Sequence, residues 1–198
     1  MKMRINLRSG IIFPVVLIAA VLFIFINGHL TGAESKTPPA ANRMQPDHAP
    51  TPFSAEEIRS GCPRDRKIVF QVEVYGKPLL YRTITFVTVN PEDAVLETVT
   101  TGMDGKKIGK KQMTIAKWKD LQAHASFPGA QTEIRPEDHS TPAGTFDCWQ
   151  YTVTSAKGGK KNVQRYWFAK SLPGPPVYVE ETVDGRIAYK MTMLKTGR

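Results

Sequence analysis

Cysteine is scarce in this sequence, and so are the motifs of common enzymes. The 198 residues include two cysteines, which excludes a disulfide-dense scaffold and a four-cysteine zinc or iron–sulfur site. There is no Gly-x-Ser-x-Gly, His-Glu-x-x-His or Cys-x-x-Cys-His motif and no phosphate-binding loop. Acidic residues are also few, 18 against 27 basic ones, so the formal net charge is +9. A hydrophobic fraction of 41% nevertheless excludes a wholly disordered chain.

Histidines offer little for catalysis. His29 and His48 precede the region expected to fold, and His124 lies beside lysines on a predicted helix. The run Asp138-His139-Ser140 has the composition of a catalytic triad, but side chains adjacent in sequence point apart and cannot form its relay. We interpret the run as a polar turn before Pro142. The sequence therefore predicts a protein that is not an enzyme and has no metal site and no cofactor.

The N-terminus has the pattern of an export signal. Residues 1–33 carry three basic residues and no acidic one, and Ile11 to Ile26 is an uncharged apolar run of sixteen residues. That length falls between the about 7–15 residues of a signal peptide and the about 17–25 of a membrane helix. Thr31-Gly32-Ala33 is an acceptable cleavage site. Residues 1–33 are predicted to be a signal peptide or an N-terminal membrane anchor, which makes the protein extracytoplasmic, in the periplasm.

Export changes the interpretation of the two cysteines. In an oxidising compartment Cys62 and Cys148 most simply form one disulfide. Closing so long a loop contributes about 4 kcal/mol in the chain-entropy model. The alternative is two unrelated buried thiols.

The exported part is predicted to contain a linker and one domain. Residues 34–52 hold five prolines among small and polar residues, which is typical of a disordered linker. Ser54 and Glu57 match a capping box, so we expect a short helix that ends near Gly61. Residues 53–198 are predicted to form a single β-rich domain.

Period-two alternation dominates from Lys67 onward and predicts about eight strands joined by hairpin turns. One helix interrupts them, from Ala116 to Ala125, with Trp118 and Leu121 on one face. The predicted fold class is α+β, mostly β: a strongly curved antiparallel sheet, or half-barrel, packed on one internal helix.

Large apolar side chains on the inward faces of these strands could line a cavity for a lipid or acyl chain. The alternative is that they pack against Trp118 and Leu121 as an ordinary dry core. The candidate lining residues are Phe70, Val72, Phe86, Trp149, Tyr151, Tyr189 and Met191.

Lysines gather in two segments of the predicted domain. Export makes a nucleic-acid partner improbable, so an anionic membrane surface or another envelope component is the expected partner. Protection of exposed strand edges explains the same lysines without any partner. The lysines concerned are Lys106, Lys107, Lys110, Lys111, Lys160 and Lys161.

The segment from Tyr166 to Glu180 combines an aromatic strand, a Pro-Gly corner and a valine-rich strand that leads to Asp184-Gly185. It resembles the closing strands of extracytoplasmic half-barrel proteins of the lipoprotein-carrier and lipid-carrier type, similar to LolA and LppX. The resemblance covers residues 67–195 by strand order and 145–195 by motif. It implies an incomplete antiparallel barrel around a helix, with an apolar cavity that binds acyl chains and no catalysis.

Two features depart from that type. Such carriers commonly have more than one lid helix, and the lipid carriers have an N-terminal cysteine for lipidation, which this chain lacks. The sequence thus favours a non-catalytic exported envelope protein that binds a hydrophobic ligand. The alternative function is a membrane-tethered accessory or interaction module of an envelope complex, with no ligand cavity.

Overall fold

The computed structural model describes residues 37–197. The predicted export segment, residues 1–33, lies outside this range. Within it, no helix is both long and apolar enough to span a membrane.

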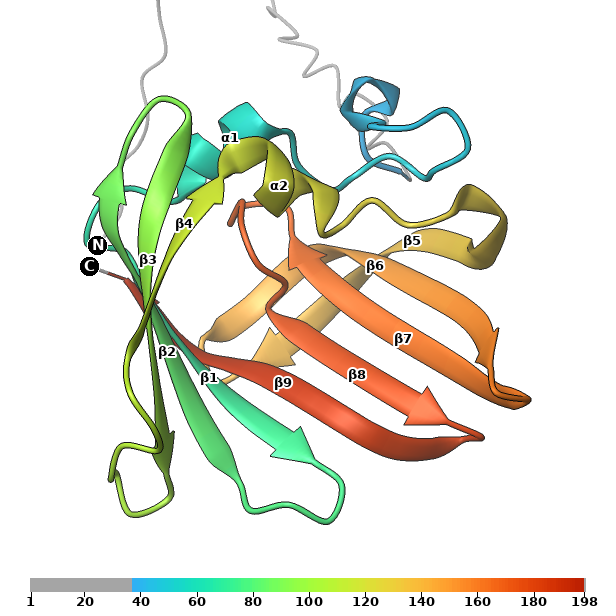
Figure 1. The fold of residues 1–198 in the computed structure, drawn as a ribbon. Helices are drawn as coiled ribbons and strands as arrows, with labels where there is room; N and C mark the ends of the chain where they lie inside the picture. Colours follow the sequence, from blue (N-terminus) through green and yellow to red (C-terminus); the bar gives the residue numbers. More distant parts are fainter. Residues whose placement is uncertain (1–36, 198) are drawn as a thin grey trace, which may run out of the picture. The chain divides into compact units, whose positions relative to one another are not determined.

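Nine strands form one antiparallel sheet in the order β4-β3-β2-β1-β9-β8-β7-β6-β5 (Figure 1). Two meanders, β1 to β4 and β5 to β9, are joined where the last strand pairs with the first. The strands are β1 (Lys67–Val74), β2 (Leu80–Val89), β3 (Asp93–Gly102), β4 (Gln112–Lys117), β5 (Thr132–Thr141), β6 (Gly144–Lys157), β7 (Lys160–Ala169), β8 (Tyr178–Val183) and β9 (Arg186–Gly197).

The mostly β class is confirmed, but two details of the predicted sheet are wrong. There are nine strands rather than about eight, and the sheet is neither closed nor strongly curled as a half-barrel. The sheet is open, since β4 and β5 are its two edge strands and each pairs with a single neighbour, and helices cover part of one face. Strand β5 also continues through Pro136 and residues 138–140, which we had interpreted as a turn. An edge strand tolerates a proline because one side of its backbone has no partner.

Two short helices, α1 (Ala55–Gly61) and α2 (Trp118–Ala123), pack against each other at one end of the sheet (Figure 1). The predicted capping box is present at α1, since the Ser54 hydroxyl accepts from the Glu57 N–H and the Glu57 carboxylate accepts from the Ser54 N–H. Helix α2 is shorter than predicted because its first two residues extend β4 instead. The Trp118 ring stacks on Phe86 of β2, which fixes α2 to the sheet.

Residues 37–53, here called the strap, differ from the disordered linker that the prolines predicted. Residues 35–198 form one compact unit, which includes the strap. The strap contains a 3-10 turn, η1 (Ala40–Asn42), and a second such turn, η2 (Gly129–Gln131), lies beside it in the α2–β5 connection. Thr51 and Phe53 of the strap are buried. Proline-rich composition predicted disorder, but it does not reveal hydrogen-bond partners that lie far along the chain.

The predicted disulfide is wrong, because Cys62 and Cys148 are both free and buried. Each thiol has its own partner: Cys62 Sγ lies 3.7 Å from the Pro173 carbonyl oxygen, and Cys148 Sγ lies 3.4 Å from that of Phe146. Burial raises the pKa of the Cys62 thiol, an effect that Arg66 partly offsets. Burial also raises the pKa of Cys148, to about 12, with a further contribution from Asp147. These are the separate buried thiols of the alternative interpretation.

Candidate functional site: an apolar cavity between sheet and helices

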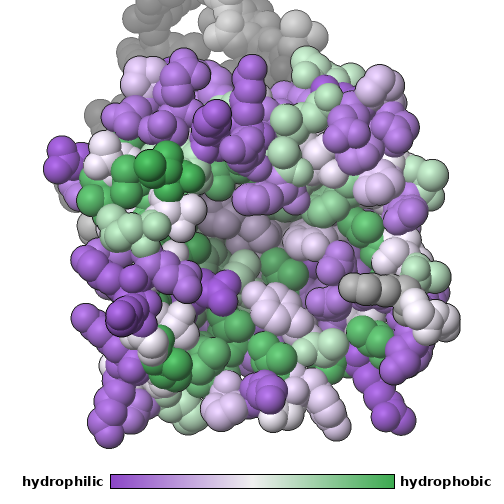
Figure 2. Space-filling model, viewed as in Figure 1, coloured by the Kyte–Doolittle hydropathy of each residue, from purple (hydrophilic) through white to green (hydrophobic). Residues whose placement is uncertain are grey.

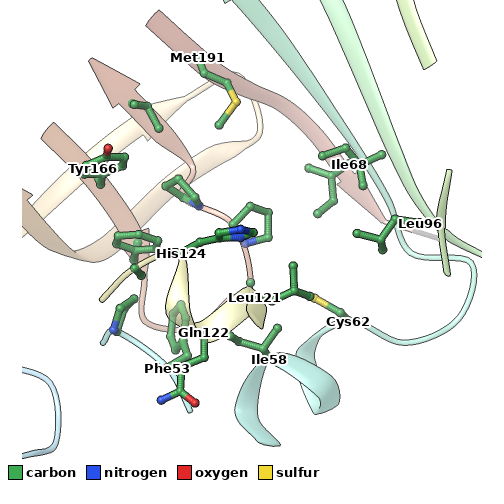
Figure 3. A pocket seen from close by; sticks show the side chains of 18 of the residues that line it. Phe53, Ile58, Cys62, Ile68, Leu96, Leu121, Gln122, His124, Tyr166 and Met191 are labelled. Atoms are coloured by element: carbon green, nitrogen blue, oxygen red, sulfur yellow. The ribbon is translucent and has the colours of Figure 1, made fainter. Parts of the chain in front are cut away.

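A cavity of about 420 Å³ lies between the sheet and the two helices. The face of the molecule in Figure 2 is hollowed near its middle, where hydrophobic side chains are visible. In Figure 3, Leu121 and His124 project from α2 between two walls, with Ile68 and Leu96 on one side and Tyr166 on the other. The cavity is therefore bounded by both meanders and by α2.

Strand alternation explains the walls. Ile68 of β1 lies opposite Ile84 of β2, and Met191 of β9 lies opposite Val179 of β8, so each pair presents its side chains on the same face. The helices close one end of the cavity with Ile58 from α1 and Leu121 from α2. Further lining comes from Pro52, Phe53, Phe86, Leu96, Phe127, Tyr166, Phe168, Pro175 and Pro176.

Only some of the predicted lining residues face this space. Phe86, Tyr189 and Met191 do. Four others do not: Phe70, Val72, Trp149 and Tyr151 are buried in a densely packed core. The inward orientation of a strand residue thus does not determine whether its side chain lines the cavity or packs in the core.

Two of those four have identifiable neighbours. The Tyr151 hydroxyl donates to the Pro50 carbonyl oxygen at 2.7 Å, because the strap covers that part of the sheet. Burial raises the pKa of Tyr151. Trp149 carries the Lys170 ammonium 4.2 Å above its ring.

Sequence reasoning missed the polar residues of the cavity, which are Arg82, Gln122, His124, Gln164 and Glu181. A signal was present for three of them. Arg82 lies between Leu80 and Ile84 on the inward face of β2, and Glu181 interrupts the inward positions of β8 in the same way. Gln164 does so on β7. A charged or polar residue within an apolar alternation is unusual and marks a position of interest.

The loop before β8 forms another wall, which a buried arginine fixes in place. Arg66 Nη1 donates to the Gly61 and Pro173 carbonyl oxygens and lies 3.2 Å from Cys62 Sγ. Gly174 has φ +136°, and a Cβ there would lie 3.1 Å from Cys62 Sγ. The close approach of loop, α1 and Arg66 therefore requires glycine at this position.

The triad-like run is confirmed not to converge. The His139 ring contacts both Trp167 and Tyr178, with ring centroids 4.8 and 4.6 Å away, and no residue of the run lines the cavity. The Ser140 hydroxyl pairs instead with that of Thr145 at 2.8 Å. Burial lowers the pKa of His139 and raises that of Tyr178 to about 12. Among residues 37–197, no three His, Cys, Asp or Glu side chains are grouped as metal ligands.

The predicted basic residues are exposed on two separate hairpins. Lys106, Lys107, Lys110 and Lys111 lie in the connection between β3 and β4, whereas Lys160 and Lys161 begin β7. Four strands separate the two hairpins in the sheet order.

Comparison with known proteins adds limited information. No family model and no curated protein sequence matches the chain. One similar solved structure is a protein from Bacteroides fragilis NCTC 9343, thought to be exported, with a YmcC-like fold: identity 9%, TM-score 0.45, covering 69% of this chain and 97% of that one. Another is MucB in complex with MucA(peri): identity 7%, TM-score 0.45, covering 72% of this chain and 53% of that one. The match thus spans about half of that MucB chain.

Proposed function

We propose that the protein is an exported, non-catalytic envelope protein that holds a hydrophobic ligand in the cavity between the sheet and α2. The observation that carries the proposal is a space of about 420 Å³ whose walls are mainly aliphatic and aromatic. Small-molecule sites typically have volumes of about 300–1,000 Å³ and this kind of lining. An apolar chain in this space would gain dispersion contacts with its walls, which favours a hydrophobic ligand.

The chemistry of the described residues supports a binding role rather than catalysis. Among the residues that line the cavity, His124 and Glu181 are candidates for general acid–base catalysis. They lie on different walls, since His124 caps α2 and Glu181 is on β8 of the sheet. The N-terminal export pattern supports an extracytoplasmic location. The half-barrel carriers that residues 145–195 resemble are consistent with the same role.

Filling the cavity is expected to weaken ligand binding. In Leu96→Trp the larger ring would occupy space at one wall, so we expect the affinity for a fluorescent fatty acid to fall at least about tenfold. Native mass spectrometry of the wild-type protein recovered from cells should show a co-purifying acyl species. The matched control is Ile187→Trp, at a strand position outside the cavity that is 46% exposed, and it should bind normally. Equal binding by both variants would contradict the proposal.

A second candidate function is an accessory module that contacts an anionic membrane surface through β4. This edge strand and the connection before it expose large apolar side chains beside lysines, a combination suited to a lipid interface. The apolar side chains are Met103, Ile108, Met113 and Ile115, which are 75, 51, 50 and 72% exposed.

Neutralising two of these lysines tests this second function. We expect residues 35–198 to co-sediment with vesicles containing phosphatidylglycerol and not with pure phosphatidylcholine. The double variant Lys110→Gln/Lys111→Gln should bind about 30-fold more weakly, because each lysine near the surface contributes about 1 kcal/mol. Lys160→Gln/Lys161→Gln removes the same charge from the other hairpin and should leave binding unchanged. Equal losses in the two variants would indicate a non-specific charge effect.

A further inference from the structure

The cavity has an end next to the helices, here called the apolar end because aromatic side chains dominate it although Gln122 and His124 also line it, and a polar end farther along the strands. At the apolar end, Phe86 stacks on Trp118 of α2, and Phe168 meets Phe53 edge-to-face. Arg82 lies four positions before Phe86 on β2, and Gln164 lies four positions before Phe168 on β7. Both also line the cavity. At about 3.3 Å per residue, this places them roughly 13 Å further from the helices.

Two more half-buried polar side chains reach this far end, Glu181 of β8 and Tyr189 of β9. These two residues are directly opposite each other in adjacent strands. Burial raises the pKa of Tyr189, while Arg82 acts to lower it and Glu181 to raise it. The phenol of Tyr189 therefore lies within electrostatic range of both charges.

The two charges differ in how they are compensated. The Glu181 carboxylate accepts a hydrogen bond from the Asn162 amide at 2.8 Å. Arg82 forms no side-chain hydrogen bond and no ion pair with any residue in the described range 37–197. A guanidinium stays charged throughout the physiological pH range and presents five donors. At a half-buried position in the cavity, such a group is suited to bind an oxygen-rich anion.

We propose that the ligand is an acyl chain with an acidic head group, whose oxygens accept hydrogen bonds from Arg82 while the chain extends toward α2. This inference rests on the proposed function and specifies its ligand class. Arginine pairs with carboxylate and phosphate in the same bidentate geometry. Tyr189 lies within electrostatic range of Arg82, and Gln164 lines the same cavity with a further donor. The polar end thus fixes the head group, and the apolar end accommodates the chain.

The test compares four ligands that share one chain: dodecanoate, dodecyl phosphate, dodecanol and dodecylamine. Binding to delipidated full-length protein is measured by displacement of a fluorescent fatty acid. We expect one or both acids to bind about 10- to 100-fold more tightly than dodecanol, as for a charge-assisted hydrogen bond. A preference for dodecanoate identifies a fatty-acid type of ligand, and a preference for dodecyl phosphate a phospholipid type.

Arg82→Gln should remove the advantage of the acids and leave dodecanol affinity unchanged, and Arg82→Lys should restore part of it. The control Arg186→Gln removes the same charge from the exposed β8–β9 turn and should behave like wild type.

Two kinds of result separate failure of this inference from failure of the proposed function. Equal affinity for dodecanol and the acids, tighter binding of dodecylamine, or an acid preference that survives in Arg82→Gln overturns the role of Arg82 while chain binding stands. If a normally folded protein binds none of the four ligands, the proposed function fails and the inference fails with it.

Discussion

Replacing Arg66 with leucine is expected to lower the free energy of unfolding by about 3 kcal/mol. Arg66 is only 4% exposed, and its guanidinium connects three parts of the chain. It donates to the carbonyl oxygen of Gly61 at the end of α1 and to that of Pro173 in the loop before β8, the latter at 2.8 Å. Its Nε reaches the Thr196 hydroxyl on β9 at 3.4 Å.

Leucine fills similar space but donates nothing, so both half-buried carbonyl oxygens would lose that donor. Each such loss costs about 1–3 kcal/mol, and relief of the buried charge offsets part of the total. The measurement is urea unfolding of residues 35–198 followed by tryptophan fluorescence. Arg64→Leu is the control, since its side chain is 74% exposed and lies 3.9 Å from Asp65; it should change the unfolding free energy by less than about 0.5 kcal/mol. Similar midpoints for both variants would show that Arg66 does not hold the loop.

Local signals in the sequence predicted local structure well. Alternation from Lys67 predicted the buried positions Ile68, Phe70 and Val72 of β1, and the capping box predicted the start of α1 at Ala55. Both features depend on neighbours within a few residues, so the sequence alone is enough to recognise them.

Long-range features could not be predicted in the same way. Counting cysteines in an exported protein favoured a bridge, but whether Cys62 and Cys148 meet depends on how α1 is placed relative to β6. The packing of neighbouring side chains, down to single methyl groups, likewise determines which inward side chains line a cavity. Arg82 is the exception, because its position on an apolar strand face could have been recognised from the alternation of β2.

The strap shows the same limit, because its contacts come from distant elements. The Ala49 N–H donates to the Phe127 carbonyl oxygen at 2.9 Å, and the Gln122 amide of α2 donates to the Thr51 hydroxyl at 3.0 Å. In Figure 1 the strap, coloured blue, lies beside the connection from α2 to β5. Phe53 then leads directly into the Ser54 cap of α1 while also lining the cavity. The strap therefore connects the stability of the domain to the shape of the site.

Removing the strap is accordingly expected to cost about 5 kcal/mol of unfolding free energy, when residues 54–198 are compared with residues 35–198. Loss of the buried Phe53 side chain alone corresponds to about 3–5 kcal/mol. The Tyr151 hydroxyl, which donates to the Pro50 carbonyl oxygen, would lose its partner and add about 1–3 kcal/mol. Against a typical domain stability of about 5–15 kcal/mol, such a loss removes between about a third and all of the stability.

A double-mutant cycle with Tyr151→Phe separates the strap's hydrogen bond from its apolar contacts. In residues 35–198 this substitution should cost about 1 kcal/mol, whereas in the truncated chain it should cost nothing or stabilise, because the hydroxyl no longer has its partner. Thermal melts followed by near-ultraviolet circular dichroism measure both values. A matched truncation to residues 37–198 removes two residues that precede the strap and should leave the midpoint unchanged. If the chain of residues 54–198 melts at the same temperature as 35–198, the strap is a linker after all, and the proline-rich composition was a correct guide.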